Sequence, residues 1–441
     1  MSKPIVAIVG RPNVGKSTLF NYLAGERVSI VDDEPGITRD RIYADAEWRG
    51  RPFSIIDTGG IEPKTDDIIL RSMREQAQIA IDTADVIIFV VDIKAGLTAD
   101  DAEIAEMLRR SGKPVVVGVN KADFVGDTPP DAYEFYNLGL GDIFAISSAH
   151  RLGIGELLDE VFTYFPDSSE HEGDEERISV AVIGKPNAGK SSLVNRILGF
   201  ERSIVTNIPG TTRDAIDSEF TNEFGSYRFI DTAGLRKKSR IDESVEKYSM
   251  IRSLAAIERA QVCLILIDAS EGVTEQDTKV AGYAHNAGKA SILVINKWDL
   301  VEKETGTLEN YERQVREKFP FMAYAPVVFI SAKTGQRVHR LFEKINEVHN
   351  SASQRLTTGM LNDLLNESTA MVPTPQDKGR HLKIYYGTQV GVRPPQFVLF
   401  VNDHHLMHFS YERYLENQFR KNYGFAGTPI WIMLRDKNKE D

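Results

Sequence analysis

The octapeptide GRPNVGKS at residues 10–17 returns as GKPNAGKS at residues 184–191. Both copies follow a short apolar run and fit the pattern G-x-x-x-x-G-K-[S/T], whose glycines let backbone N–H groups approach phosphates. The lysine of such a loop reaches the β- and γ-phosphates, its serine holds Mg²⁺, and the helix that follows adds positive potential. The sequence therefore predicts two phosphate-binding loops, each between a strand and a helix.

Further motifs repeat in the same order behind each loop. The pairs are Thr38 in PGITRD with Thr212 in PGTTRD, Asp57 in DTGG with Asp231 in DTAG, and NKAD from Asn120 with NKWD from Asn296. The threonines and aspartates are 174 positions apart, as the loops are, and the NKxD motifs are 176 apart. A repeat of this length indicates a duplicated domain. It argues against a P-loop fold with degenerate sites.

Short apolar runs such as Val86–Val91 and Val115–Val119 alternate with helical stretches such as Ala102–Arg110. This alternation is typical of a doubly wound α/β domain with a mostly parallel sheet. The last part of the chain has no phosphate loop and its pattern predicts a small α+β domain. We predict a first P-loop domain over residues 1–165, an acidic linker over 166–177, a second P-loop domain over 178–351 and a C-terminal domain over 352–441.

Composition narrows the class of protein. Hydrophobic residues make up 41% of the 441, which suits a globular chain. The single cysteine, Cys263, lies in an apolar run, so the sequence predicts a buried strand position, no disulfide framework and a reducing compartment. We expect neither a secretion signal nor a membrane span. The net charge of −11 is uneven, because the chain is acidic through residue 176 and slightly basic beyond it. That asymmetry leaves room for nucleic acid on the second half.

The NKxD motifs indicate guanine selectivity. A carboxylate accepts hydrogen bonds from two adjacent guanine N–H groups, so Asp123 and Asp299 are predicted to read the base. For Asn120 and Asn296 two roles stay open, orienting the loop or touching the ring. The lysine of each motif can lay its stem along the base. The strand ends Ser147-Ser148-Ala149 and Ser331-Ala332-Lys333 are expected to supply a backbone amide for the guanine oxygen.

The segments between these motifs predict a nucleotide-dependent switch. Thr38 and Thr212 are placed to close over Mg²⁺ and the γ-phosphate, and Asp57 and Asp231 to face the metal. The predicted metal residues are therefore Ser17, Thr38, Asp57, Ser191, Thr212 and Asp231. The predicted catalytic residues are Lys16, Thr38, Gly60, Asn13, Lys190, Thr212, Gly234 and Asn187, where the backbone N–H of Gly60 and Gly234 senses the γ-phosphate.

The predicted nucleotide-binding residues complete the set. In the first domain they are Gly10, Arg11, Pro12, Asn13, Val14, Gly15, Lys16, Ser17, Asp57, Thr58, Gly59, Gly60, Asn120, Lys121, Ala122, Asp123, Ser148 and Ala149. In the second they are Gly184, Lys185, Pro186, Asn187, Ala188, Gly189, Lys190, Ser191, Asp231, Thr232, Ala233, Gly234, Asn296, Lys297, Trp298, Asp299, Ser331, Ala332 and Lys333.

One expected residue is absent from both copies. Ras-type enzymes carry a water-orienting glutamine directly after DxxG, where this chain has Ile61 and Leu235. Asn13 and Asn187 are candidates to coordinate a monovalent cation beside the phosphates, in place of an arginine finger. The alternative is that each asparagine only stabilises its loop.

Taken together, the tandem GxPNxGKS, PGxTRD, DTxG and NKxD motifs, followed by HFSYERYLENQFR, resemble the Der family, also called EngA. The resemblance covers essentially the whole chain and implies a KH-like C-terminal domain, GTP hydrolysis stimulated by K⁺, and nucleotide-dependent binding to the large (50S) ribosomal subunit. It further implies a cytoplasmic, monomeric factor for assembly of that subunit, contacting its rRNA but neither DNA nor membrane. The exposed GxxG loop of ordinary KH modules is missing, as in the family.

Several local features carry alternatives. The basic run Arg236–Arg240 after DTAGL is either a solvated face or a contact with RNA or the C-terminal domain that changes with the nucleotide. For Arg39 and Arg213 the sequence leaves two roles open, a functional one and a local salt bridge to the neighbouring aspartate. For His404, His405 and His408 exposure in a loop is favoured over a metal site.

Two other functions compete with ribosome assembly. A slow regulatory switch that binds a protein partner when loaded with GTP is favoured by the missing glutamine and disfavoured by the two intact sites and the PNxGKS motif. A tRNA-modifying GTPase is disfavoured, because Cys263 is not near the C-terminus.

Overall fold

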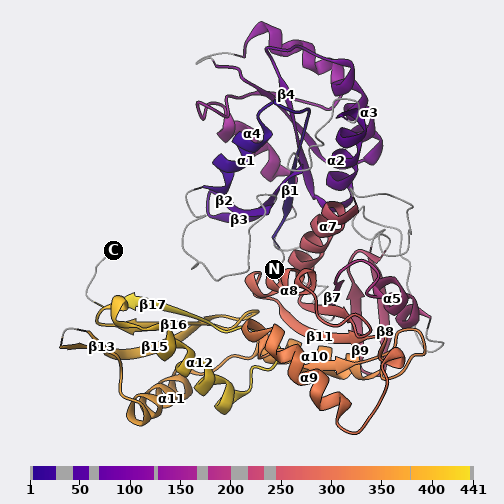
Figure 1. Cartoon of the computed structure of the whole chain (residues 1–441). Coiled ribbons are helices and arrows are strands. Elements are labelled where there is room, and N and C mark those ends of the chain that lie inside the picture. Colours follow the sequence, from indigo (N-terminus) through magenta and orange to yellow (C-terminus); the bar gives the residue numbers. More distant parts are fainter. Residues whose placement is uncertain are drawn as a thin grey trace. The chain divides into compact units, whose positions relative to one another are not determined.

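The computed structural model describes residues 3–25, 43–58, 69–123, 128–165, 177–199, 217–232, 245–377 and 379–437. Within these residues the chain forms two compact units (Figure 1). The first unit comprises the described residues up to 165 together with 245–259, and the second comprises the rest. The predicted linker lies outside the described residues except for Arg177, and the predicted domain boundaries stay a prediction.

The first unit is built on a six-stranded sheet in the order β2-β3-β1-β4-β5-β6. All neighbouring strands are parallel except the hairpin β2–β3. Its elements are β1 (Ile5–Val9), α1 (Lys16–Ala24), β2 (Tyr43–Trp48), β3 (Arg51–Asp57), α2 (Ile69–Thr83), β4 (Val86–Asp92), α3 (Ala99–Ser111), β5 (Val115–Asn120), a 3₁₀ helix (Pro130–Leu138), β6 (Ile143–Ala145) and α4 (Ile154–Thr163). Strand β4 is buried along its whole length, as its apolar run predicts.

One helix of the first unit comes from the second repeat. Helix α7 (Val245–Arg259) packs against α2, with Ile251 and Ala255 in the same buried cluster as Met73 and Ala77. By its packing, this helix belongs to the first unit, whereas the order of the repeated motifs places it in the second P-loop domain.

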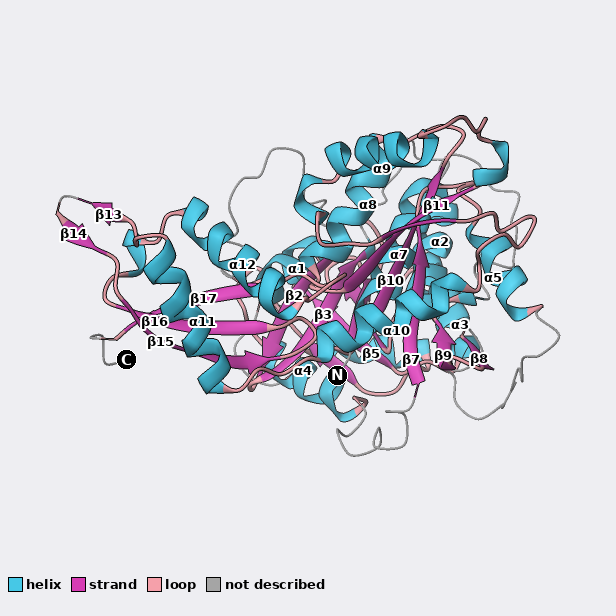
Figure 2. Cartoon of the chain, turned by 90° about the horizontal axis from the view of Figure 1, so that it is seen from below, coloured by secondary structure: helices cyan, strands magenta, loops and turns pink. Residues whose placement is uncertain are grey.

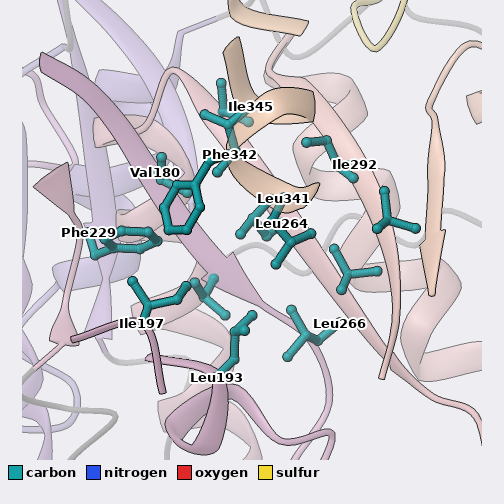
Figure 3. Close-up of a cluster of buried hydrophobic side chains, with 14 of the residues drawn as sticks. Val180, Leu193, Ile197, Phe229, Leu264, Leu266, Ile292, Leu341, Phe342 and Ile345 are labelled. Atoms are coloured by element: carbon teal, nitrogen blue, oxygen red, sulfur yellow. The ribbon is translucent and has the colours of Figure 1, made fainter. Parts of the chain in front are cut away.

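The second unit repeats the sheet in the order β12-β11-β10-β7-β9-β8. Its elements are β7 (Arg177–Ile183), α5 (Lys190–Leu198), β8 (Ser218–Asn222), β9 (Gly225–Phe229), β10 (Val262–Asp268), α8 (Glu275–Asn286), β11 (Ala290–Asn296), α9 (Thr307–Lys318), β12 (Val327–Phe329) and α10 (Arg340–Ser353). Leucine and isoleucine side chains from α5, α10 and the central strands form one buried cluster with Phe229 and Phe342 (Figure 3). Cys263 is buried in β10, as predicted.

The C-terminal part of the second unit is a small α+β domain. Its elements are α11 (Thr358–Met371), the ribbon β13 (Gln376–Asp377) and β14 (Arg380–His381), β15 (Ile384–Gly391), β16 (Gln396–Val401), α12 (Phe409–Tyr423) and β17 (Trp431–Asp436). Strand β16 pairs antiparallel with β15 and parallel with β17, and α11 and α12 cover this sheet (Figure 2).

Backbone hydrogen bonds fasten this domain to the second P-loop domain. The Ser291 N–H donates to the Gly427 carbonyl at 2.7 Å, and the Gly427 N–H donates to the Tyr324 carbonyl at 2.9 Å. Arg420 of α12 lies over the Tyr324 ring, and burial raises the pKa of that tyrosine. The fold is thus the predicted one: two P-loop α/β domains followed by a small α+β domain.

Candidate functional site

Each phosphate-binding loop joins a strand to the helix that follows it in the sequence, β1 to α1 in the first domain and β7 to α5 in the second. Gly15 and Gly189 precede α1 and α5 in the left-handed region, both at φ 99°. A Cβ atom at either glycine would stand 2.2 Å from an asparagine amide nitrogen, that of Asn120 or Asn296. Glycine is therefore required here both for backbone conformation and for close approach.

The loop lysines fold back onto their own loops. Lys16 Nζ donates to the Arg11 carbonyl at 2.6 Å, and Lys190 Nζ donates to the carbonyls of Gly184 and Lys185 at 2.7 and 2.8 Å. Burial lowers the pKa of Lys190 to about 8, against a smaller opposing effect of Asp277. A phosphate that offers its oxygens to Lys190 favours the charged form and reverses that shift.

The NKxD asparagines tie three loops together. Asn120 Nδ2 donates to the Val14 carbonyl at 2.6 Å, while its Oδ1 accepts from the Ser148 N–H at 2.9 Å. Asn296 repeats this with the Ala188 carbonyl at 2.8 Å and the Ala332 N–H at 2.9 Å. Both ends of each buried amide are engaged by backbone, so the geometry favours the loop-orienting role over contact with the base.

The NKxD lysines also have a repeated partner. Lys121 and Lys297 adopt left-handed backbone conformations at φ 62° and 60°. Lys121 Nζ donates to Asp92 Oδ2 at 2.6 Å, and Lys297 Nζ pairs with Asp268 in the same way. These two aspartates end β4 and β10, and sequence reasoning missed them. The sequence did contain a signal for them: in each domain an aspartate directly follows an apolar run, at the same edge of the sheet as the other motifs.

The two aspartates predicted to read the base have different surroundings. Asp123 Oδ2 accepts from Lys94 Nζ at 2.6 Å, and its Oδ1 accepts from Ser147 Oγ at 2.7 Å. Hydrogen bonds from Lys94 and Ser147 hold the pKa of Asp123 below its usual value. Asp299 Oδ1, by contrast, is a buried oxygen without a hydrogen-bond partner among the described residues.

Of the predicted metal residues, Ser17 and Asp57 meet: Ser17 Oγ donates to Asp57 Oδ2 at 2.8 Å. In the second domain β9 ends at Phe229, and Asp231 follows it at φ 55° with its N–H bonded to Asp217 Oδ1 at 2.9 Å. The predicted residues Thr38, Gly59, Gly60, Thr212, Ala233 and Gly234 lie outside the described residues, as do Arg39, Ile61, Arg213, Leu235 and the basic run Arg236–Arg240.

Asn13 and Asn187 are exposed and both have φ 63°. Asparagine is among the few non-glycine residues that tolerate this conformation. The backbone alone thus gives one reason for an asparagine at each position, which supports the loop-stabilising alternative without opposing a cation contact.

A buried carboxylate braces the second residue of each phosphate loop. Arg11 Nε donates to Asp101 Oδ1 at 2.8 Å, and Lys185 Nζ lies 3.5 Å from Asp277 and 2.8 Å from Glu271. Asp101 and Asp277 each complete a T-x-x-D capping box at the start of α3 or α8. The capping box is visible in the sequence, but its contact with the loop is not.

A cavity of about 330 Å³ lies between α5 and the strand end after β12. It is lined by Ser192, Asn195, Arg196, Gly199, Ala332 and Lys333. Arg196 Nε donates to the Ala332 carbonyl at 3.2 Å, and the guanidinium also bonds the Lys333 carbonyl. In the first domain the matching contact is Arg151 over the Tyr22 ring, 5.4 Å from its centroid.

The three histidines of the C-terminal domain separate into two groups. His404, His405 and Asp403 bring ligand atoms within 4.8 Å of one another, and His404 Nδ1 lies 2.8 Å from Asp436. Arg380 already bonds the Asp403 carboxylate at 3.1 Å. His408 instead caps α12 by accepting from the Ser410 N–H.

The chain matches models of known protein families over most of its length. Residues 5–121 and 179–297 match the family described as 50S ribosome-binding GTPase, and residues 355–435 match the KH-domain-like C-terminal part of EngA bacterial GTPase enzymes. "GTPase Der" of Acetivibrio thermocellus is 65% identical over 440 residues, and "GTPase Der" of Ruminiclostridium cellulolyticum is 65% identical over 441. Each alignment covers 100% of both chains.

The chain belongs to the Der, or EngA, family of GTPases. It is accordingly a GTPase that binds guanine nucleotide, with the KH-like C-terminal domain of the Der family. The FeoB G domain of Methanococcus jannaschii is a structural match at 25% identity, covering 37% of this chain and 98% of that one, but its TM-score of 0.28 adds nothing to the assignment. Within the described residues, no helix has the length and apolar character needed to cross a membrane.

Proposed function

We propose that the chain binds GTP at two sites, one in each P-loop domain, with Asp123 and Asp299 reading the base. The observation that carries this is the repeated tie in which Asn120 and Asn296 link the phosphate loop to the strand end on the other side of the base position. The amides of Ser148 and Ala332 are engaged by these ties. The next amides, those of Ala149 and Lys333, are therefore the candidates for the guanine oxygen.

The decisive test is a switch in base preference. Asp123→Asn and Asp299→Asn replace an acceptor with an amide whose NH₂ donates, which suits the 2-carbonyl of xanthine better than the 2-amino group of guanine. We expect each variant to lose tens- to hundreds-fold in GDP affinity at its own site, since hydrogen bonds to charged groups are strong ones, and to gain xanthosine diphosphate binding there. Unaltered GDP binding in both variants would refute the assignment.

The side-chain oxygens at the first phosphate loop fit Mg²⁺. Ser17 Oγ and Asp57 Oδ2 lie 2.8 Å apart at the start of α1, and small hard cations prefer such ligands. We assign the metal to Ser17, Thr38 and Asp57 in the first domain and to Ser191, Thr212 and Asp231 in the second. When bound there, Mg²⁺ neutralises charge on the phosphates. The protein's own share is to orient these oxygens and to bring Lys16 and Lys190 to the phosphates.

We further propose that K⁺ stimulates hydrolysis, because Ile61 and Leu235 cannot position water as a glutamine would. The exposed side-chain oxygens of Asn13 and Asn187 fit a weakly bound monovalent cation next to the loops. We expect kcat to be higher in KCl than in NaCl at equal ionic strength, and the difference to vanish when both asparagines become alanine. Equal rates in the two salts would remove this role and favour the slow regulatory switch.

The family description and the charge distribution support a partner rich in phosphate. We propose that the GTP form binds the large ribosomal subunit and its rRNA during assembly of that subunit, acting as a cytoplasmic monomer. The chain is acidic through residue 176 and slightly basic beyond it, so the second half suits an RNA surface.

Gradient sedimentation of extract tests the ribosomal proposal. We expect chain loaded with a non-hydrolysable GTP analogue to migrate with large subunits and the GDP form to do so weakly. Neutralising Arg236, Lys237, Lys238 and Arg240 should weaken that binding and flatten its salt dependence, leaving GTP affinity nearly unchanged. Sedimentation with a smaller protein partner only would support the switch instead.

A further inference from the structure

The two NKxD aspartates differ in what contacts them, although their loops are otherwise alike. Asp123 forms an ion pair with Lys94 at 2.6 Å, with 63% of the lysine side chain and 35% of the aspartate side chain exposed. Its second carboxylate oxygen is bonded to Ser147. Asp299 has one buried oxygen, Oδ1, that accepts no hydrogen bond from any described residue. Both carboxylate oxygens that guanine needs therefore already accept a hydrogen bond in the first domain, whereas Oδ1 accepts none from the described residues in the second.

Position for position, the second domain replaces Lys94 with Ser270. Lys94 N–H donates to Oδ1 of Asp92, the residue that ends β4, at 2.9 Å, and Ser270 N–H donates to Oδ1 of Asp268, the residue that ends β10, at 3.0 Å. The backbone turn is the same, but the side chains diverge. Ser270 Oγ bonds Asp268 at 2.6 Å instead of reaching the base-reading aspartate.

We propose that Lys94 competes with guanine for Asp123 and so weakens base recognition in the first domain only. This rests on the proposed role of Asp123 in reading guanine. An ammonium on one carboxylate oxygen lowers the negative charge that the guanine N–H groups meet, and the ion pair must loosen before both guanine donors are accepted. Lys94 is thus a specificity-determining residue, which the second domain lacks.

The size of the effect follows from exposure. Exposed ion pairs contribute little, so removing this competitor should tighten GDP binding by about two- to fivefold. Because salt screens charges in solvent, the gain should be largest at low ionic strength and shrink at high salt. Inosine diphosphate lacks the 2-amino donor that guanine offers to the carboxylate, so it should gain less than GDP does.

The experiment is a GDP titration of the full chain in an Asp299→Asn background, which leaves the first site as the strong one. Lys94→Ser copies the second domain's residue, and Lys94→Arg retains the ion pair. Lys344→Ser is the matched control, because Lys344 of α10 pairs with Glu347 at 2.6 Å with 40% of its side chain exposed and belongs to none of the nucleotide motifs. The reciprocal variant, Ser270→Lys in an Asp123→Asn background, installs the competitor in the second domain.

We expect Lys94→Ser to bind GDP two- to fivefold more tightly at low salt, Lys94→Arg and Lys344→Ser to match the parent chain, and Ser270→Lys to weaken the second site. A Lys94→Ser variant that binds GDP equally or less tightly would overturn the proposal, because Lys94 would then be neutral or would help to orient Asp123. If Asp123→Asn leaves GDP binding unaltered, the assignment of Asp123 fails first, so the two failures are distinguishable.

Discussion

The two P-loop domains agree in their loops and differ just outside them. In both domains one buried asparagine of the NKxD motif forms hydrogen bonds that link the phosphate loop to the end of the following strand. In both domains the lysine of that motif also pairs with the aspartate that ends the neighbouring strand. We call these repeated contacts the shared frame. Beyond this frame, Lys94 faces Asp123 in the first domain, whereas Ser270 turns away from Asp299 in the second. On the proposed function, the repeated contacts are the ones that guanine nucleotide binding needs, and the differing contacts adjust each site.

The largest loss of GDP affinity should come from removing the hydrogen bonds of the NKxD asparagine, which both domains share. Asn120→Ala leaves the Val14 carbonyl and the Ser148 N–H buried without their partner, and each such group costs about 1–3 kcal/mol. We expect GDP affinity at the first site to fall by tens-fold, with thermal unfolding of that domain at a lower temperature. Asn296→Ala should do the same to the second site only. If either variant weakened GDP binding at both sites equally in a calorimetric titration, the two domains would not bind nucleotide independently.

An effect of intermediate size should be a pH dependence of the GDP affinity at the second site. Burial lowers the pKa of Lys190 to about 8, whereas phosphate binding raises it because the anion favours the ammonium. Below pH 8 the lysine is already charged in the free protein, so affinity is at its plateau. Above it, binding takes up a proton, and affinity should fall by about tenfold per pH unit until the pKa of the complex is reached.

Calorimetry in buffers of different ionisation enthalpy measures that proton uptake directly. An Asp123→Asn background isolates the second site, and Lys190→Met should abolish the uptake together with most of the affinity. Affinity that stays flat between pH 7 and 9 in that background would contradict the assignment of a depressed pKa to Lys190.

The smallest effect should come from the contact that the domains build differently. Arg196 holds the carbonyls of Ala332 and Lys333 in the second domain, and the Tyr22–Arg151 contact takes its place in the first. We expect Arg196→Ala to weaken GDP at the second site by a few-fold, since one charged donor to two carbonyls is removed while the asparagine tie remains. Tyr22→Ala is the matched variant for the first site, and a loss as large as that of Asn296→Ala would show that Arg196 belongs to the shared frame.

Much of the frame could be predicted from sequence because its signals are local. Glycine spacing fixes the loop, apolar runs fix the buried strands, and α1 and α5 begin at the predicted lysines. The repeat supplied a second, independent copy of every motif. The KH-like fold of the last domain was expected only through the family resemblance.

The contacts that could not be predicted join residues far apart in the chain. Arg11 reaches Asp101 across 90 positions, and Asn120 reaches Val14 across 106. Lys94 sits in a turn with no motif of its own, so nothing in its surroundings signalled Asp123. Helix α7 packs against α2 of the first unit although the motif repeat places it in the second domain. Such pairings depend on how the elements pack, which a linear pattern does not contain.

The central claim, two guanine-nucleotide sites built on one repeated frame, is tested most directly by the number of GDP molecules bound per chain. Titration calorimetry of the unmodified chain at pH 7 should give two, with one strong site left in Asp123→Asn, one in Asp299→Asn and none in the double variant. A stoichiometry of one in the unmodified chain, or ATP competing equally with GTP at either site, would contradict the account.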